Sequence, residues 1–306
     1  MTMNDTFFKN YPGHDRLELP EPLVRVTAGK GGEAILILGS EKTGIYDCGM
    51  ACFNEKLIEN IRAVLEPAGR TLDYVFMSHT HYDHIGALPY LIRQWPDVKV
   101  CGSPKAEKVF KSEGAKKTMV RLGENARQLY GCGDVEITAE GMRLDVAMEE
   151  GSSVSLGDIS VKAFETKGHT DCSMSYMVEP AGILFASEST GVHAGPDFMY
   201  TAILKSYRES IESAEKLAGL EFNYIISPHY GVIPQHQNPV YFRRCIQAAN
   251  EEKALVEDGA AEGLTFEEIL EKHKEKYWSD ERNLNQPYAA YRLNAEITCR
   301  LLMAGK

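Results

Sequence analysis

Short apolar runs alternate with amphipathic stretches between Leu23 and Ala186. An apolar run that is rich in β-branched or aromatic residues and bounded by turn-forming residues predicts a strand. The runs that meet this description are Leu23–Ala28, Ala34–Gly39, Thr43–Asp47, Asp73–Ser78, Val98–Cys101, Val135–Thr138, Val154–Leu156, Ile159–Thr166, Ser173–Val178 and Gly182–Ala186. So many strands exclude a helical bundle, and we expect the stretches between them to form helices on the outer faces of sheets.

Helical periodicity marks two of the stretches between these runs. In Asn54–Leu65, apolar residues recur at the spacing that places Leu57, Ile58, Ile61 and Leu65 on one face of a helix. His84–Trp95 predicts a second helix, which begins directly after a polar turn rich in histidine.

The C-terminal part of the chain carries mainly helical signals. Asn238, followed by proline, predicts the N-cap of a helix that continues to Gly259. Thr265 and Glu268 have the spacing of a capping box, and Pro287–Met303 is a further helical stretch. We therefore expect the last part of the chain to be mainly helical.

The composition and charge of the chain exclude several classes of protein. With 306 residues, 43% of them hydrophobic and 25% charged, the chain can form a sizeable core and is typical of a globular protein. Its 33 Lys and Arg against 44 Asp and Glu give a net charge of −11. This sign is wrong for affinity that depends on neutralising phosphates, so we expect no nucleic-acid partner.

The sequence shows no signal for export or membrane insertion. Residues 1–22 lack a charged head followed by an apolar stretch, and runs such as Ala34–Leu38 are far shorter than the ~18 residues that span a bilayer. The seven cysteines are scattered and form no C-x-x-C pair, which argues against a disulfide framework or a cysteine zinc site. We expect a cytoplasmic protein with reduced, mostly buried thiols and no membrane partner. The sequence leaves a homodimer open.

One segment of this acidic chain is locally basic. Pro104–Arg121 carries six basic residues against two acidic ones. A solvated helix face is the favoured interpretation, and the alternative is a rim that attracts an anionic substrate.

Four residues with metal-binding side chains follow the predicted strand that ends near Met77. They are His79, His81, Asp83 and His84. Side chains two residues apart in an extended segment lie on the same side, and Asp83 at an N-cap would place His84 on the first turn of the next helix. Burying such a group without partners is costly, and metal coordination removes that cost. The cluster therefore predicts a metal site.

Three further strands end at a residue of the same kind. His169 follows Ile159–Thr166, with Gly168 allowing a close approach of the backbone. Glu188 follows the run that ends at Ala186, and His229 follows Tyr224–Ile226. Packing alone does not require a histidine or a carboxylate at each of these strand ends.

These residues give the sequence a resemblance to the metallo-β-lactamase fold superfamily. The signature His79-x-His81-x-Asp83-His84 is highly specific for it, and Asp47-Cys48-Gly49 matches the family's usual Asp-x-Gly. The resemblance implies an α+β fold, an αββα sandwich of two mixed β-sheets flanked by helices, with metals at one edge. It implies a domain over residues 23–236, an N-terminal arm over 1–22, and a C-terminal helical extension over 237–306 that covers the active site.

The resemblance also implies two divalent metal ions and their ligands. The implied ligands are His79, His81 and His169 for one metal, Asp83, His84 and His229 for the other, and Glu188 as the bridging carboxylate. Most hydrolytic members have Asp at the bridging position, so Glu188 is a departure. Its longer side chain can bridge with altered metal spacing, chelate one metal or move aside. Zinc is the first expectation, with iron and manganese as alternatives.

A dinuclear centre of this kind indicates hydrolysis. A water between two metals has its pKa lowered towards about 7 and can supply hydroxide, and Asp83 would be the catalytic residue that orients this nucleophile or accepts the proton of the water. The first hypothesis is therefore hydrolysis of an ester, thioester, lactone or phosphoester in a small-molecule substrate. The alternative is a non-haem di-iron oxidoreductase, either oxygen-activating or oxygen-reducing, because oxygen-using di-iron members show similar Glu variation.

Substrate contacts have weaker signals. His193 lies in a loop shortly after Glu188 and is a candidate pocket residue. Tyr200, Tyr288 and Tyr291 are candidates for the roof of the pocket, although core packing is the favoured interpretation for these tyrosines.

Overall fold

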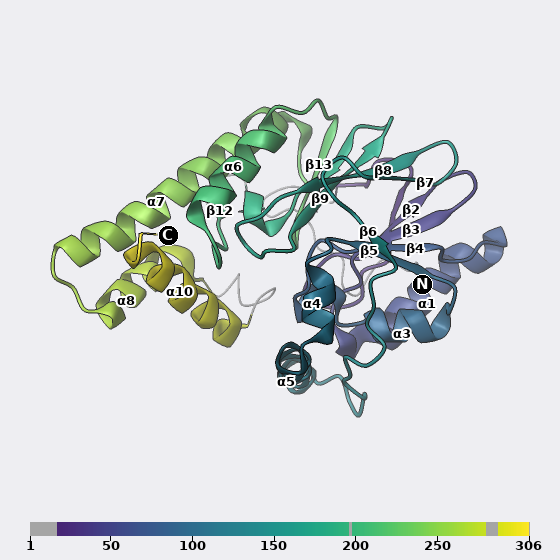
Figure 1. Cartoon of the computed structure of the whole chain (residues 1–306), viewed down its shortest axis with the longest axis horizontal. Helices are drawn as coiled ribbons and strands as arrows, with labels where there is room; N and C mark the ends of the chain where they lie inside the picture. Colours follow the sequence, from purple (N-terminus) through teal and green to yellow (C-terminus); the bar gives the residue numbers. More distant parts are fainter. Residues whose placement is uncertain (1–16, 196–197, 280–286, 306) are drawn as a thin grey trace. The chain divides into compact units, whose positions relative to one another are not determined.

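The structure is a computed structural model that describes residues 17–195, 198–279 and 287–305 (Figure 1). Most of the predicted N-terminal arm lies outside the described residues. Glu18–Glu165 and Met174–Leu184 form one compact unit, and Thr166–Ser173 with residues 185–305 form the second. The predicted boundaries at residues 22 and 236 stay predictions.

The first sheet follows the order of the sequence. Its strands are β1 (Leu23–Arg25), β2 (Ile35–Leu38), β3 (Thr43–Tyr46), β4 (Tyr74–Phe76), β5 (Lys99–Gly102) and β6 (Val146–Ala147). The pairs β1–β2 and β2–β3 are antiparallel, and the pairs from β3 to β6 are parallel. The sheet is therefore mixed, and its parallel strands β3, β4 and β5 end at the same edge.

The second sheet has the order β14-β13-β10-β9-β8-β7. Its strands are β7 (Ser153–Ser155), β8 (Ser160–Glu165), β9 (Met174–Glu179), β10 (Ile183–Phe185), β13 (Tyr224–Ser227) and β14 (Gly231–Val232). Within the first unit this sheet packs on the first one, because the Tyr176 ring lies 5.7 Å from that of Phe76 and its hydroxyl donates to the Met77 carbonyl at 2.8 Å. Buried aromatic rings thus fill the sandwich.

Helices of the first unit connect its strands. They are α1 (Asn54–Leu65), α2 (Tyr82–Ile85), α3 (Leu88–Gln94), α4 (Ala106–Lys111) and α5 (Glu113–Tyr130), with 3-10 turns η1 (Ala51–Phe53) and η2 (Glu66–Ala68). Helix α1 has the predicted bounds and buries Leu57, Ile61 and Leu65, whereas Ile58 of the predicted face is only half-buried. In α4 and α5, Lys108, Lys111 and Arg121 are exposed, as a solvated helix face requires.

The second unit is mainly helical. Besides β13 and β14, its elements are η3 (Glu188–Thr190), β11 (Val192–His193), β12 (Met199–Tyr200), α6 (Tyr207–Ala218), η4 (Gln235–Val240), α7 (Tyr241–Ala261), α8 (Phe266–Tyr277) and α10 (Tyr288–Met303). The predicted capping box of Thr265 and Glu268 opens α8. Helices α7, α8 and α10 pack around a core that includes Val256, Ile269 and Cys299 (Figure 1).

Three sequence predictions about elements are wrong. Val135–Thr138 is not a strand, because the Tyr90 hydroxyl takes the Glu136 carbonyl as its hydrogen-bond acceptor and Ile137 packs against α5. The helix predicted over His84–Trp95 is two helices, since Pro89 has no N–H to continue the hydrogen-bond ladder. Helix α7 begins at Tyr241, after a 3-10 turn that contains the proline following Asn238.

The expected fold is confirmed: two mixed sheets are flanked by helices and followed by C-terminal helices. All seven cysteines are free thiols, and six of them are buried, as expected. None of the helices in the described part of the chain has both the length and the apolar character needed to cross a membrane.

Candidate metal centre

The histidine-rich segment follows β4 and leads into α2. His81 is the N-cap, with extended backbone at φ −76° and ψ 149°, so the predicted N-cap at Asp83 is wrong by two residues and Asp83 lies inside the helix. The ring centroid of His79 lies 4.5 Å from that of His81 and 4.2 Å from that of His84. One short turn therefore brings three imidazoles into contact.

Asp47 orients two of these side chains. It is fully buried directly after β3 and has a left-handed backbone, with φ 48°. One of its carboxylate oxygens accepts the main-chain N–H of Ser78 at 2.7 Å. The other lies 2.7 Å from Ser78 Oγ and 2.8 Å from His84 Nδ1. Because a carboxylate only accepts, His84 carries its proton on Nδ1, which leaves the Nε2 lone pair for a metal.

Ser78 extends this arrangement to His79. Its hydroxyl proton goes to Asp47, so Ser78 Oγ accepts from His79 Nδ1, which lies 2.9 Å away. His79 therefore also presents Nε2 as a ligand atom. Beside these groups, burial and secondarily the Asp83 carboxylate raise the pKa of Tyr82 well above its usual range, so its phenol stays neutral.

His169 is oriented within the second unit. Its Nδ1 lies 2.6 Å from the Ala202 carbonyl, to which it donates, and its main-chain N–H donates to Ser189 Oγ at 2.9 Å. Gly168 has φ +130°, and a Cβ there would lie 2.1 Å from Ser210 Oγ. The predicted close approach at this glycine is thus observed, and it fixes the backbone that carries His169.

Glu188 and His229 lie beside His169. Glu188 opens η3 after β10 and is 8% exposed, and His229 lies between β13 and β14 with a left-handed backbone at φ 64°. Glu188 Oε1 lies 3.0 Å from His229 Nε2, and Oε2 lies 3.5 Å from His169 Nε2. The two carboxylate oxygens thus point to different histidines, as a bridging or chelating group can.

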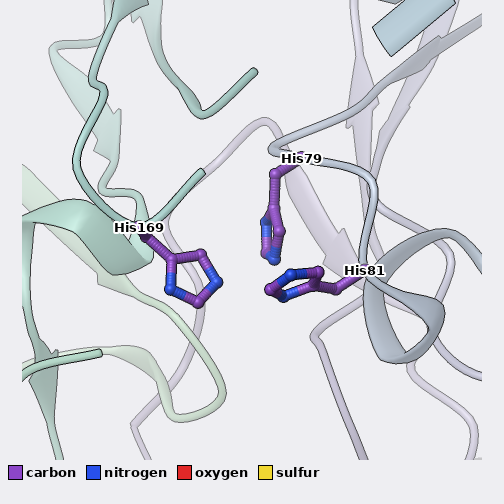
Figure 2. A group of neighbouring side chains, drawn as sticks. All are labelled: His79, His81 and His169. Carbon is purple, nitrogen blue, oxygen red and sulfur yellow. The ribbon is translucent and has the colours of Figure 1, made fainter. Parts of the chain in front are cut away.

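The predicted ligands are divided between the two units. His79, His81, Asp83 and His84 belong to the first unit, and His169, Glu188 and His229 belong to the second. Figure 2 shows His79, His81 and His169, and the His79 and His81 rings of the first unit meet edge to face. Imidazole nitrogens with carboxylate oxygens suit zinc, iron or manganese, so these side chains fit a transition-metal site.

The candidate substrate residues have different surroundings in the structure. His193 is fully buried, and its Nε2 lies 3.2 Å from the Arg244 guanidinium. Tyr288 is 37% exposed and its ring packs against Trp278 at 5.2 Å. Tyr200 and Tyr291, in contrast, both line a pocket in the second unit. A substrate role for any of them stays a prediction.

Sequence reasoning missed two groups of residues. Asp47 belongs to the motif Asp47-Cys48-Gly49, but the motif alone does not indicate that Asp47 holds Ser78 and His84 in place. Glu252 and His273 carried no signal, because they lie on different helices and meet only through packing, with His273 Nε2 2.8 Å from Glu252 Oε1.

Comparison with known structures supports the fold. The solved archaeal protein ST1585 from Sulfurisphaera (Sulfolobus) tokodaii superposes with a TM-score of 0.60 at 20% identity, covering 94% of this chain and 100% of that one. In sequence the two are 27% identical over 190 residues, which are 58% of this chain and 69% of ST1585.

Three other relatives have names that describe different functions. A probable RNase of Methanocaldococcus jannaschii is 29% identical over 66% of this chain and 49% of its own length. A hydroxyacylglutathione hydrolase of Legionella pneumophila is 27% identical over 48% of this chain and 44% of its own. The flavo-diiron protein FprA2 of Clostridium acetobutylicum is 30% identical over 34% of this chain and 25% of its own length. The chain thus spans half or less of the length of each of these three relatives.

A model of the metallo-beta-lactamase superfamily matches residues 29–229. This match covers more than half of the chain and includes every predicted metal ligand. The chain therefore belongs to the metallo-beta-lactamase superfamily.

Proposed function

We propose that the chain is a dinuclear metal-dependent hydrolase that attacks an ester, thioester, lactone or phosphoester bond. The proposed ligands are His79, His81, Asp83, His84, His169, Glu188 and His229. The observation that carries the proposal is the orientation of the imidazoles: Asp47, Ser78 and the Ala202 carbonyl take the Nδ1 protons of His84, His79 and His169. Such orienting partners are typical of histidines that bind a metal through Nε2.

The chain's own residues would supply the proton chemistry. When bound, two divalent metals, zinc first and iron or manganese as alternatives, would supply hydroxide at neutral pH and polarise the bond under attack. Asp83 has a side chain that is 19% exposed, so water reaches it, and we assign it the role of holding the nucleophile or accepting its proton. Asp47 keeps the neighbouring His84 in the tautomer that this site needs.

We propose a small molecule as the substrate. The hydroxyacylglutathione hydrolase relative supports this assignment, and the RNase relative is the evidence against it. The net charge of −11 favours the small molecule, because phosphate backbones are bound by positive surfaces.

The test combines metal analysis with a screen of acyl and phosphoryl esters. We expect about two metal ions per chain and turnover that falls by at least about a hundredfold in Asp83→Asn and is lost in His81→Ala. His236→Ala removes an exposed histidine outside the centre and is the matched control. Full turnover in His81→Ala would overturn the proposal.

One observation favours a di-iron oxidoreductase as the second candidate. Glu188 stands where most hydrolytic members have Asp, and the flavo-diiron relative FprA2 shows that similarity extends beyond hydrolases. Iron near two per chain, with oxygen consumption and no ester turnover, would favour this candidate. Zinc with ester turnover would exclude it.

A further inference from the structure

A small pocket in the second unit is lined in part by the candidate ligand Glu188 and has a cavity volume of about 30 Å³. Its lining is aromatic and acidic, and none of the described lining residues is a lysine or an arginine. They are Glu188, Tyr200, Thr201, Ala202, Glu252, His273, Tyr277, Tyr291, Asn294, Ala295 and Thr298. The charge of this lining is therefore opposite to that of the basic segment in the first unit.

The lining includes a buried carboxyl group, that of Glu252. The residue is 2% exposed, and its Oε1 lies 2.8 Å from His273 Nε2 while the Thr201 hydroxyl donates to Oε2. His273 Nδ1 in turn lies 2.8 Å from the Tyr291 hydroxyl. Among the described residues, His273 is the one ion-pair partner of Glu252, and no described lysine or arginine pairs with this buried carboxyl group. A positive ligand would offset that cost.

The remaining walls suit an organic cation. Three tyrosines line the pocket, and aromatic faces attract ammonium groups, most strongly where water is excluded. Asn294 lines the same pocket, so its carboxamide can contact a ligand there. An anionic group would instead meet two carboxylates.

We propose that this pocket binds a small organic ammonium group carried by the substrate. The assignment rests on the proposed function, since the bond to be cleaved would lie at the metals that Glu188 helps to bind. Recognition of the ammonium group by the rings and by Glu252 then selects among the esters that the metals could cleave.

Trp278 provides a direct binding signal. It packs on the pocket residue Tyr291 with ring centroids 4.9 Å apart, and Trp95 is the other tryptophan of the chain. In a Trp95→Phe background, fluorescence is titrated with n-propylammonium chloride, with 1-propanol as the neutral probe of equal length and with potassium chloride as the ionic control. We expect a saturable change with propylammonium and binding of propanol at least about tenfold weaker.

Two variants test whether the Glu252 carboxyl group itself, and not the general negative charge of the helix, binds the ammonium group. Glu252→Gln keeps the shape and should weaken propylammonium binding about tenfold while leaving propanol unchanged. Glu251→Gln, an exposed neighbour on the same helix, is the matched control and should change neither. If Glu252→Gln fails to fold, the comparison of the probes on the Trp95→Phe protein still decides the matter.

The outcomes distinguish this proposal from the proposed function. No saturable response to propylammonium, equal binding of propanol, or the same response to potassium would overturn the ammonium site. Because the titration needs no turnover, ammonium binding without any hydrolysis would overturn the hydrolase alone. Hydrolysis without ammonium preference would overturn the pocket assignment alone.

Discussion

Individual residues that bind no metal hold the candidate ligands in place. Asp47 satisfies three donors at once, two from Ser78 and one from His84, and it is fully buried. A buried carboxylate with three hydrogen bonds has little freedom to move, so the imidazole that it holds is preorganised.

Asp47→Asn should therefore weaken metal binding without removing a ligand. An amide offers one acceptor oxygen in place of two, so the Nδ1 proton of His84 loses its charged partner. We expect metal affinity to fall about 10- to 100-fold, measured by competition with a chelator. Asp73→Asn removes a carboxylate that accepts from the Thr43 N–H and is the control. Equal affinity in both variants would contradict this role of Asp47.

Gly168 is a second such residue, because the chain passes Ser210 there with no room for a side chain. In Gly168→Ala, the alanine would have to adopt φ +130°, and its Cβ would lie 2.1 Å from Ser210 Oγ. We expect a loss of at least about 2 kcal/mol in the free energy of unfolding, together with lower metal content because His169 moves.

The control for this prediction is Gly219→Ala. Gly219 has an ordinary φ of −82°, and its nearest atom to a new Cβ is 3.5 Å away. Chemical denaturation of the two variants should show little change in Gly219→Ala. Equal losses in both would mean that the close approach at Gly168 does not constrain the backbone.

The sequence predicts which residues are candidate metal ligands, but it does not predict the residues that orient them. Imidazoles and carboxylates at strand ends can be read from local pattern, and His79, Glu188 and His229 do follow β4, β10 and β13. The contact of Asp47 with His84 joins residues 37 apart through the parallel pairing of β3 with β4. No local pattern specifies that contact.

At the level of elements, prediction succeeded where local signals agreed with packing. Helix α1 has both the predicted bounds and the predicted buried face, and α8 begins at its capping box. It failed for Val135–Thr138, whose β-branched residues pack as a loop against α5 and have no neighbouring strand. Strand propensity reports burial as much as pairing, which explains the error.

The start of α8 provides a test at this scale, because the helix carries the pocket residues His273 and Tyr277. In the capping box, Thr265 Oγ1 accepts the Glu268 N–H at 3.3 Å and Glu268 accepts the Thr265 N–H at 2.8 Å. Thr265→Ala should cost about 1 kcal/mol of stability. Amide hydrogen exchange should rise in the first turns of α8.

Glu271→Ala, an exposed change on the same helix, serves as the control for the cap. It should alter stability by less than about 0.5 kcal/mol. Unchanged exchange at the start of α8 in Thr265→Ala would show that packing alone fixes this end of the helix.

For the molecule as a whole, the buried thiols create a dependence on pH. Burial raises the pKa of Cys101, Cys245 and Cys299 each to about 12. Between the unfolded value near 9 and this folded value, the unfolded chain loses the thiol protons while the folded chain keeps them. Stability is therefore fully present below about pH 9 and falls as the pH rises towards 12.

A substitution of Cys245 tests the contribution of one thiol separately from other groups that titrate at alkaline pH. Cys245→Ala should be less stable than the parent at pH 8, because it leaves a small cavity, but it cannot lose a thiol proton. The difference in unfolding free energy should therefore shrink by roughly 1 kcal/mol between pH 8 and pH 10. Val256→Ala makes a cavity on the same buried helix face without an ionisable group, so its difference should stay constant. A constant difference for Cys245→Ala as well would show that its thiol ionises equally in the folded and unfolded chain.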